Sequence, residues 1–328
     1  MLKEIGEFGL IEMLKQNTIN DSKNVVIGIG DDAAVLRPES DKLQLVSTDM
    51  LIEGVHFDLS FITPFELGYK ALAVNLSDIA AMGGDPKHVV VAIAIPKQLS
   101  AKWLVELYRG MKSIAKDFSV NIVGGDTVSS QNDLVINVTA IGEVAEENLQ
   151  RRSTAEIGDL VVVTGFLGDS AAGLSCLQQG IRNKIFAKPL IKAHHLPLPQ
   201  VDIAKIIAPL ATAMNDISDG LASEANEIAA ASNVSILLNE ASLPLSPQLV
   251  AAANCLDVDP LEWALYGGED YQLVFTIKKA QYEKIQQEQL LQKLTVVGRV
   301  TEAGSGVSLL NETGKIVKIA AKGYNHFI

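Results

Sequence analysis

The sequence predicts a globular α/β protein (α+β in its broader sense) built from two domains. Its 328 residues exceed what one hydrophobic core usually contains, which favours two domains over one. Apolar runs with the spacing of strands alternate with amphipathic, helix-like runs along the chain. The composition is 48% hydrophobic and 20% charged, so the chain can bury a large core, and this excludes a disordered protein.

The first part of the chain predicts both helices and strands. An amphipathic run indicates a short helix over residues 4–16, and a longer apolar pattern predicts a helix over residues 64–82. The other elements expected here are strands over residues 25–27, 43–48 and 88–95, a helix over 100–117, and strands over 120–123 and 134–144.

A polar stretch over residues 145–152 interrupts this pattern and predicts the boundary between the domains, which we place at 1–147 and 148–328. Beyond it we expect a strand over residues 160–164, a helix over 169–179, an extended surface connector over 188–200 because of its three prolines, and alternating strands and helices over 211–328 with a β-rich end.

Several classes of protein are disfavoured by composition. The longest apolar run, residues 89–95, ends at Pro96 and is far shorter than the roughly 18 residues that span a bilayer. The first residues lack the basic start and apolar block of a signal peptide, so a cytoplasmic location is expected. A net charge of −12 disfavours nucleic-acid binding, because phosphate contacts need clustered Lys and Arg. Cys176 and Cys255 are expected to be buried, reduced thiols.

One glycine-rich segment resembles a dinucleotide-binding loop. Residues 28–33, GIGDDA, fit the G-x-G-x-x-A pattern, with Asp49 about 20 residues further on. However, Asp31 and Asp32 would place two carboxylates where the pyrophosphate binds, and Pro38 leaves no room for the long helix that should follow. A dehydrogenase is therefore disfavoured.

A second glycine-rich segment, TGFLGDS over residues 164–170, lies between a predicted strand and a predicted helix. A P-loop would place a lysine where this segment has an aspartate. The segment is better explained as a turn that caps the following helix, with Asp169 or Ser170 as the N-cap.

Acidic residues beside glycine, serine and asparagine form the most informative pattern. Asp78 falls on the same helical face as Leu67, Ala71 and Val74, and an unpaired carboxylate on a buried face is costly unless a metal or hydrogen-bond donors compensate. Comparable acids are expected where other apolar elements end, in STD (47–49), GGDT (124–127), NDISDG (215–220) and GGED (267–270).

Each of these segments alone is typical of an ordinary turn or helix cap. Together they form a set of oxygen ligands without histidine or cysteine, which suits a hard cation and favours Mg²⁺ over Zn²⁺. Several Mg²⁺ ions bridging carboxylates to a polyphosphate would allow an acidic protein to bind an anionic substrate. The sequence therefore predicts a phosphoryl-transfer enzyme without a P-loop.

The same segments also carry a resemblance to a known family. In order along nearly the whole chain, GIGDDAAV, STDMLIEGVHF, KALAVNLSDIAAMGGDP, VGGDT, GDSAAGL, NDISDGL, GGEDY and GYNHF resemble the thiamine-monophosphate kinases. The chain is also similar to the wider superfamily of aminoimidazole ribonucleotide synthetase, selenophosphate synthetase and a hydrogenase-maturation protein. The resemblance implies an N-terminal domain whose mixed sheet pairs across a homodimer, a C-terminal α/β domain, and transfer of phosphate from ATP to thiamine monophosphate.

The resemblance also implies roles for individual residues. The positions that match Mg²⁺ ligands are Asp31, Ser47, Thr48, Asp49, Asp78, Asp126, Asp216 and Asp219. The positions that match nucleotide contacts are Tyr108, Gly125, Asp126, Arg152 and Ser218, with Arg151 beside Arg152 as an alternative. The positions that match the thiamine-phosphate pocket are His56, Glu269 and Tyr324. From the residues alone, His56 could equally be an exposed turn residue and Tyr324 an edge aromatic.

No general base or covalent nucleophile stands out in the sequence. His194 and His195 lie in the proline-rich segment, and neither cysteine is near a motif. A phosphate monoester is already a dianion at pH 7 and needs no base, so direct in-line transfer is expected. Two alternatives stay open: another ATP-dependent member of the superfamily, such as an aminoimidazole ribonucleotide synthetase, and a non-catalytic nucleotide-binding maturation partner.

Overall fold

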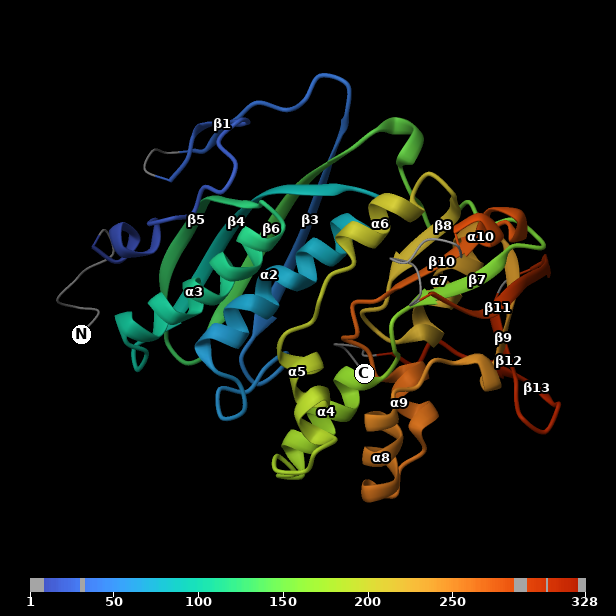
Figure 1. Ribbon diagram of the computed structural model, residues 1–328. Coiled ribbons are helices and arrows are strands. Elements are labelled where there is room, and N and C mark those ends of the chain that lie inside the picture. The colour runs from blue at the N-terminus through green and yellow to red at the C-terminus, as the bar shows by residue number, and fades with distance from the viewer. Residues whose placement is uncertain (1–8, 30–32, 286–293, 305, 324–328) are drawn as a thin grey trace. The chain divides into compact units, whose positions relative to one another are not determined.

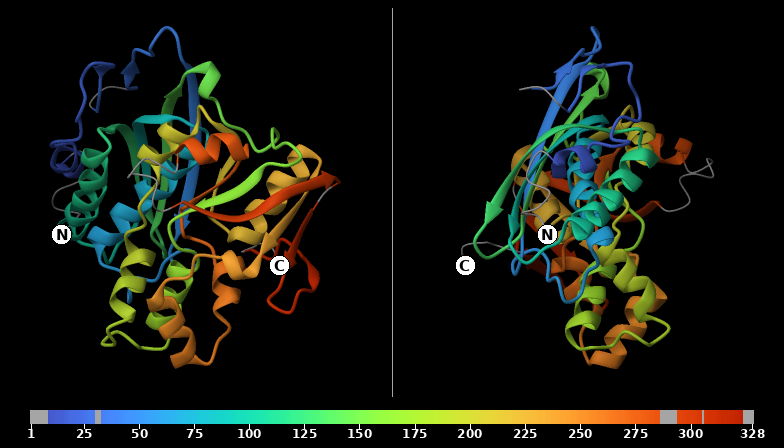
Figure 2. Two further views of the ribbon diagram at one scale, coloured as in Figure 1. Left: turned by 45° about the vertical axis from the view of Figure 1, so that its right-hand side comes forward. Right: turned by 90° about the vertical axis from the view of Figure 1, so that its left-hand side faces the viewer.

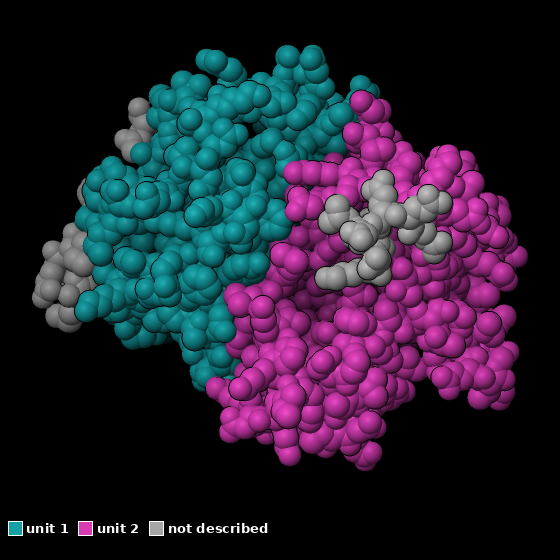
Figure 3. Space-filling model, in the orientation of Figure 1, with its two compact units in different colours: residues 1–79, 84–146 teal, residues 80–83, 147–328 magenta. Residues whose placement is uncertain are grey.

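The computed structural model describes residues 9–29, 33–285, 294–304 and 306–323. The chain forms two compact units, one of residues 1–79 and 84–146 and the other of residues 80–83 and 147–328 (Figure 3). Each unit contains its own mixed β-sheet with helices, which confirms the predicted α/β fold. No helix in the described part of the chain has the length and apolar character needed to span a membrane.

The first unit is built on a four-stranded sheet in the order β3-β6-β4-β5 (Figure 1). Its strands are β3 (Leu43–Ile52), β4 (Asp85–Pro96), β5 (Asn121–Ser130) and β6 (Val135–Val144). Only β4 and β5 run parallel, because a helix connects them, and the other neighbours are antiparallel. A short hairpin of β1 (Val25–Ile27) and β2 (Val35–Leu36) precedes the sheet.

Two helices, α2 (Pro64–Ala81) and α3 (Ala101–Asp117), cover one face of this sheet (Figure 1). Helix α2 is buried almost all round, whereas α3 has one buried and one solvated face and begins at the N-cap Ser100. The helices touch backbone to backbone at two glycines. A Cβ on Gly68 would lie 1.8 Å from the Leu107 carbonyl oxygen, and one on Gly110 would lie 1.9 Å from the Phe65 carbonyl oxygen. Only glycine permits this separation.

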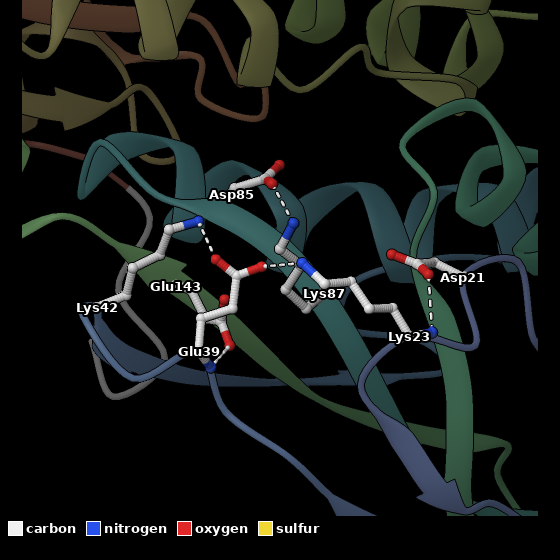
Figure 4. Close-up of polar contacts among 7 residues, drawn as sticks. All are labelled: Asp21, Lys23, Glu39, Lys42, Asp85, Lys87 and Glu143. Atoms are coloured by element: carbon white, nitrogen blue, oxygen red, sulfur yellow. Dashed lines mark hydrogen bonds and ion pairs between the residues drawn. The ribbon is translucent and has the colours of Figure 1, made fainter.

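Charged side chains join the residues on either side of the β1–β2 hairpin to one end of the sheet (Figure 4). The Glu39 carboxylate pairs with Lys23 at 3.1 Å and Lys42 at 2.9 Å, and these lysines lower the pKa of Glu39 to about 2. The Glu39 backbone N–H donates to the buried Glu143 carboxylate at 3.1 Å. Lys87 pairs with Asp85 on the same strand. This network fixes the loop before β3 and contains none of the predicted site residues.

The second unit contains a seven-stranded sheet in the order β13-β12-β9-β11-β7-β10-β8. All neighbours are antiparallel except β9 and β12. The strands are β7 (Leu160–Thr164), β8 (Ala211–Asp216), β9 (Val234–Asn239), β10 (Leu273–Ile277), β11 (Leu294–Ala303), β12 (Gly306–Leu310) and β13 (Ile316–Ile319). The central strands β7 and β10 are almost wholly buried, as their continuous apolar sequences indicate.

The helices of this unit form two apolar clusters. Helix α7 (Leu221–Ser232) packs on the sheet, and α4 (Asp169–Gln178), α5 (Ala187–His195) and α8 (Pro247–Leu256) pack on one another around Cys176 and Leu190. In Figure 2 the yellow-green α4 and α5 lie beside the orange α8 in both views. The remaining helices are α6 (Val201–Ile207), α9 (Pro260–Tyr266), α10 (Lys279–Ile285) and the short turns η1 (Glu146–Asn148) and η2 (Glu240–Ser242).

Two predictions from the sequence were wrong. Residues 188–200 are not an extended connector, because α5 occupies most of the segment and α6 begins directly after it. Pro189 lies in the first turn of α5, where no backbone N–H is required, and the other two prolines follow the end of that helix. Cys176 is buried as expected, but Cys255 is exposed in the last turn of α8.

Candidate functional site

In the first unit, the side chains of β3 and α2 bring two carboxylates together. Successive residues of a strand point to opposite faces, so Ser47 and Asp49 both point toward the face that α2 covers. There the Ser47 hydroxyl donates to the Asp78 carboxylate. Because β3 is an edge strand, the Asp49 backbone N–H is available to donate to Asn75 Oδ1, at 3.1 Å. The buried Asn75 was missed from the sequence, although a polar residue in an apolar helix is a signal.

The two carboxylates destabilise each other's charge. Burial, and then the neighbouring Asp78, raise the pKa of Asp49 to about 7. Such a shift arises when two acids share a desolvated space and only one of them can ionise without a cation. The donor set here contains only oxygens, two of them from carboxylates, which is the set that a hard divalent cation prefers. The residues present therefore fit such an ion.

The sheet separates two other predicted ligands of this unit, Thr48 and Asp126, from that pair. Thr48 points to the opposite face, where its hydroxyl lies 3.1 Å from Thr139 Oγ1 and accepts from Asn137 Nδ2 at 3.2 Å. In the strand register, Asp126 pairs with Ala92, Ala92 with Asn137, and Asn137 with Met50. Residues paired in this way point to the same face of the sheet, and Met50 shares its face with Thr48. Thr48 and Asp126 therefore lie on the face opposite Asp49.

Asp126 is also distant from Asp49 along the sheet. Asp49, Val138, Val91 and Gly125 form one row across β3, β6, β4 and β5, so Gly125 lies three strand spacings, roughly 14 Å, from Asp49. The Asp126 carboxylate is exposed and accepts from the Thr127 N–H at 2.9 Å. Asp49 and Asp126 were both expected where strands end, which was wrong, since each lies within a ten-residue strand.

Two further predicted residues of this unit are held in place by their surroundings. Tyr108 is buried on the inner face of α3, and burial raises its pKa to about 12. His56 is half-buried in the turn after β3, where its Nδ1 accepts the Ile52 N–H at 3.0 Å. That bond leaves the proton of neutral His56 on Nε2.

In the second unit, the NDISDG segment forms a loop between the end of β8 and the start of α7, as the sequence predicted. Asn215 and Asp216 are buried at the last residues of the strand, and Ser218 and Asp219 are half-buried in the loop. Gly220 has φ of 95° and supplies no side-chain cap to α7. Glu224, in the first turn of α7, reaches back to the loop, where its Oε1 accepts the Asp219 N–H at 3.1 Å and the Ser218 hydroxyl at 3.2 Å.

The side chain of Arg152 is connected to this loop. Its Nε donates to Asn215 Oδ1 at 3.0 Å, and its Nη1 lies 3.1 Å from Glu227 Oε2. The amide of Asn215 in turn donates to Glu224. Neither glutamate was singled out from the sequence. The signal that could have identified Glu224 is an acid in the first turn of a helix that starts with glycine.

The buried Asp270 joins two further loops of this unit. Its carboxylate accepts the Gly168 N–H at 2.6 Å and the Ser170 N–H at 3.2 Å, at the start of α4. The N-cap of α4 is Gly168, with φ of 81°, so the expectation that Asp169 or Ser170 caps this helix was wrong. Residues 268, 269 and 271 all have positive φ, and this strained turn is tied to the NDISDG loop, since the Glu269 N–H donates to the Ser218 carbonyl at 2.6 Å.

Glu269 lies beside a histidine that the sequence had placed in a surface connector. Oε2 of Glu269 is 3.4 Å from Nδ1 of the buried His194, and the same nitrogen is 3.1 Å from Ser170 Oγ. Glu269 is partly exposed and His194 is not. This cluster brings α4, the end of α5 and the 267–272 turn together around the Glu269 carboxylate.

Two predicted site residues, Asp31 and Tyr324, lie outside the described residues. Gly323, next to Tyr324, donates its N–H to Ser223 Oγ at 3.0 Å, at the start of α7. Among the residues that the structure describes, no three acidic, histidine or cysteine side chains converge closely enough to hold a metal ion. A cation bound by these acids would therefore need oxygens from a ligand or from water as well.

Comparison with known proteins gives consistent results over the whole chain. Residues 30–144 match the AIR synthase related protein N-terminal domain, and residues 156–311 match its C-terminal domain. The chain is 40% identical to the thiamine-monophosphate kinase of Bacillus subtilis (strain 168), over 98% of this chain and 99% of that protein.

Solved structures agree with this. The thiamine-monophosphate kinase of Stenotrophomonas maltophilia K279a aligns with a TM-score of 0.83 and 35% identity over 93% of this chain and 96% of that one. AaThiL complexed with AMPPCP and TMP aligns with a TM-score of 0.80 and 37% identity over 100% of this chain and 99% of that one.

Proposed function

This chain belongs to the thiamine-monophosphate kinase family. On that premise we propose that it transfers the γ-phosphate of ATP to thiamine monophosphate, giving thiamine diphosphate and ADP. The observation that carries the proposal is the similarity over almost the full length of both chains, which includes every acidic segment discussed above. The solved relative named AaThiL holds AMPPCP and TMP together, which supports an ATP-dependent reaction on a thiamine phosphate.

The cation that we propose is Mg²⁺, with several ions in the site. The raised pKa of Asp49 beside Asp78 supports a cation between β3 and α2, with Ser47 near it. Bound there, Mg²⁺ would neutralise charge on the phosphates. Because the sheet separates these residues from Thr48 and Asp126, one ion cannot serve the whole set. We assign Asp31, Thr48, Asp126, Asp216 and Asp219 to further ions, completed by ATP oxygens and water.

The nucleotide and substrate contacts are also proposals. Arg152 and Ser218 belong to one hydrogen-bonded network, which supports a shared role for them on the ATP side with Gly125 and Asp126. Tyr108, whose side chain is buried on the inner face of α3, is also proposed as a nucleotide contact. Glu269, His56 and Tyr324 would contact thiamine monophosphate. Glu269 is partly exposed beside His194, and its negative charge suits the cationic ring of the substrate.

A homodimer is supported by the face of the first sheet that α2 and α3 leave uncovered. Val46 is 67% exposed, Met50 51% and Val128 49%, an apolar arrangement that a second copy of the sheet would bury. We accordingly assign dimerisation and Mg–ATP binding to residues 1–147, and completion of the nucleotide and substrate site to residues 148–328.

ADP release should depend on the acceptor. With ATP and Mg²⁺, we expect the purified protein to release ADP rapidly with thiamine monophosphate and at background rate without it, measured by a coupled assay. Aminoimidazole ribonucleotide synthetase activity would instead require that enzyme's own substrate, and a non-catalytic partner would release no ADP with any acceptor. Either result would contradict the proposed activity.

Transfer should be direct, without a phosphorylated enzyme. The acceptor phosphate is a dianion at pH 7 and can attack without a base, and His194 Nδ1 is already in contact with Ser170 and Glu269. Incubating the protein with γ-labelled ATP and Mg²⁺ before adding acceptor, then quenching in denaturant, should leave no label on the protein. Label that is retained and then passes to thiamine monophosphate would show a covalent intermediate.

A further inference from the structure

Glu224 lies at the centre of a hydrogen-bonded network in the second unit. It is in the first turn of α7 and is only 3% exposed. Its Oε1 accepts from Ser218 and Asp219 in the loop, and its Oε2 accepts from the amide of Asn215 at the end of β8. Both carboxylate oxygens are thus used by donors from the segment that immediately precedes the helix.

The network extends from Glu224 to Arg152. Asn215 donates to Glu224 through Nδ2 and accepts from Arg152 Nε through Oδ1, so the orientation of its amide is set by both partners. Glu227, one turn further along α7, accepts from the same Nδ2 at 3.2 Å and pairs with Arg152 at 3.1 Å. A change at Glu224 therefore reaches the loop and the arginine together.

The donors explain why this position carries a carboxylate. All three partners donate, so an acceptor is needed at both oxygens. A glutamine of the same size would place its NH₂ against either the Asn215 NH₂ or the Asp219 N–H. Oε1 already accepts two hydrogen bonds, and Oε2 accepts one from the Asn215 amide.

We propose that Glu224 is a positioning residue, which holds the 215–219 loop and the Arg152 guanidinium in one arrangement so that Asp216, Asp219 and Arg152 meet the metal-bound nucleotide together. The expected effect on nucleotide binding rests on the proposed kinase function. The hydrogen bonds that hold the loop are present in the ligand-free protein. Glu224 contacts neither substrate nor metal and acts through the residues that do.

Glu224→Gln tests this, and Glu227→Gln is its matched control. Both replace a glutamate of the same helix by the glutamine of equal size and both residues contact Asn215, but only Glu224 contacts Ser218 and Asp219. In the ligand-free protein, hydrogen–deuterium exchange of peptides covering 215–220 should be at least about tenfold faster in E224Q and unchanged in E227Q. In the assay, E224Q should raise KM for ATP and the Mg²⁺ concentration for half-maximal rate about tenfold, with KM for thiamine monophosphate within about twofold.

Glu224→Asp keeps both carboxylate oxygens but shortens the side chain, and it should show the same effects more weakly. It also serves if E224Q does not fold. Unchanged exchange in both Glu224 variants would overturn the proposal, as would equal effects of E224Q and E227Q on exchange and on KM for ATP. The exchange measurement needs no activity, so a wild-type protein that does not phosphorylate thiamine monophosphate would refute the proposed function and leave the positioning test intact.

Discussion

Asp49→Asn should abolish measurable turnover, a loss of at least roughly 10³-fold in kcat, without unfolding the protein. Asp49 and Asp78 share a partly desolvated space, and Asn supplies an oxygen of similar reach but no charge. The site would then lose one of the negative charges that hold the cation, and the cation neutralises the phosphates. Asp126→Asn should have a similar effect from the opposite face of the sheet. Steady-state ADP release at ordinary Mg²⁺ measures both, and retained activity in both variants would refute the metal assignment.

The stability of the metal-free protein provides a separate readout for the same substitution. Because the folded-state pKa of Asp49, about 7, is above the ordinary value of 3.8, the folded protein holds the proton more tightly than the unfolded chain. The contribution of Asp49 to the free energy of unfolding should therefore be present at about pH 4, decline as the pH rises to about 7, and stay lost above it. In chelator-treated protein, D49N should make this decline shallower.

A control separates charge balance from packing. Thr48 lies beside Asp49 on the strand but points to the other face, where it contacts Asn137 and Thr139. Thr48→Val should leave the pH dependence of unfolding between pH 4 and 7 unchanged. If D49N unfolds with the same pH dependence as the wild type in the absence of metal, burial and the neighbouring Asp78 do not raise the pKa of Asp49 as proposed.

The sequence predicted most elements because their patterns are local. The apolar helix at α2, the helix α3, and the strands β1, β4 and β7 all lie close to the expected residues. The error at α5 came from counting prolines without their positions, since Pro189 in a first helical turn does not break a helix. The α4 cap was misassigned because its acceptor, Asp270, is about 100 residues away in sequence.

The candidate site shows the same limit. Acid identities could be read from the sequence, and Asp78 was identified from its place in a buried helix. The separation of Asp49 from Asp126 could not be predicted from the sequence, because it depends on the register of three strand pairs. The contact of His194 with Glu269 and the hydrogen bond from Arg152 to Asn215 join residues far apart in the chain, so sequence spacing gives no indication of them.

Gly68→Ala and Gly110→Ala should each destabilise the first unit by about 3 kcal/mol, more than most surface substitutions. The added methyl carbon would lie within 2 Å of a backbone carbonyl oxygen on the neighbouring helix, and backbone atoms cannot rotate away as a side chain can. Alanine raises helix propensity by about 1 kcal/mol, which does not offset the clash. We expect a fall in Tm of roughly 5–10 °C in thermal unfolding.

The control is Gly124→Ala on β5, where the new Cβ would meet only the Val90 methyl groups at 3.8 and 3.9 Å, so its Tm should change little. The double variant should cost less than the sum of the single variants, because one separation of α2 from α3 accommodates both methyl groups. That separation would also move Asn75 and Asp78 on α2 away from β3, so activity should fall in the surviving folded protein. Unchanged Tm in both single variants would show that the helices do not pack this closely.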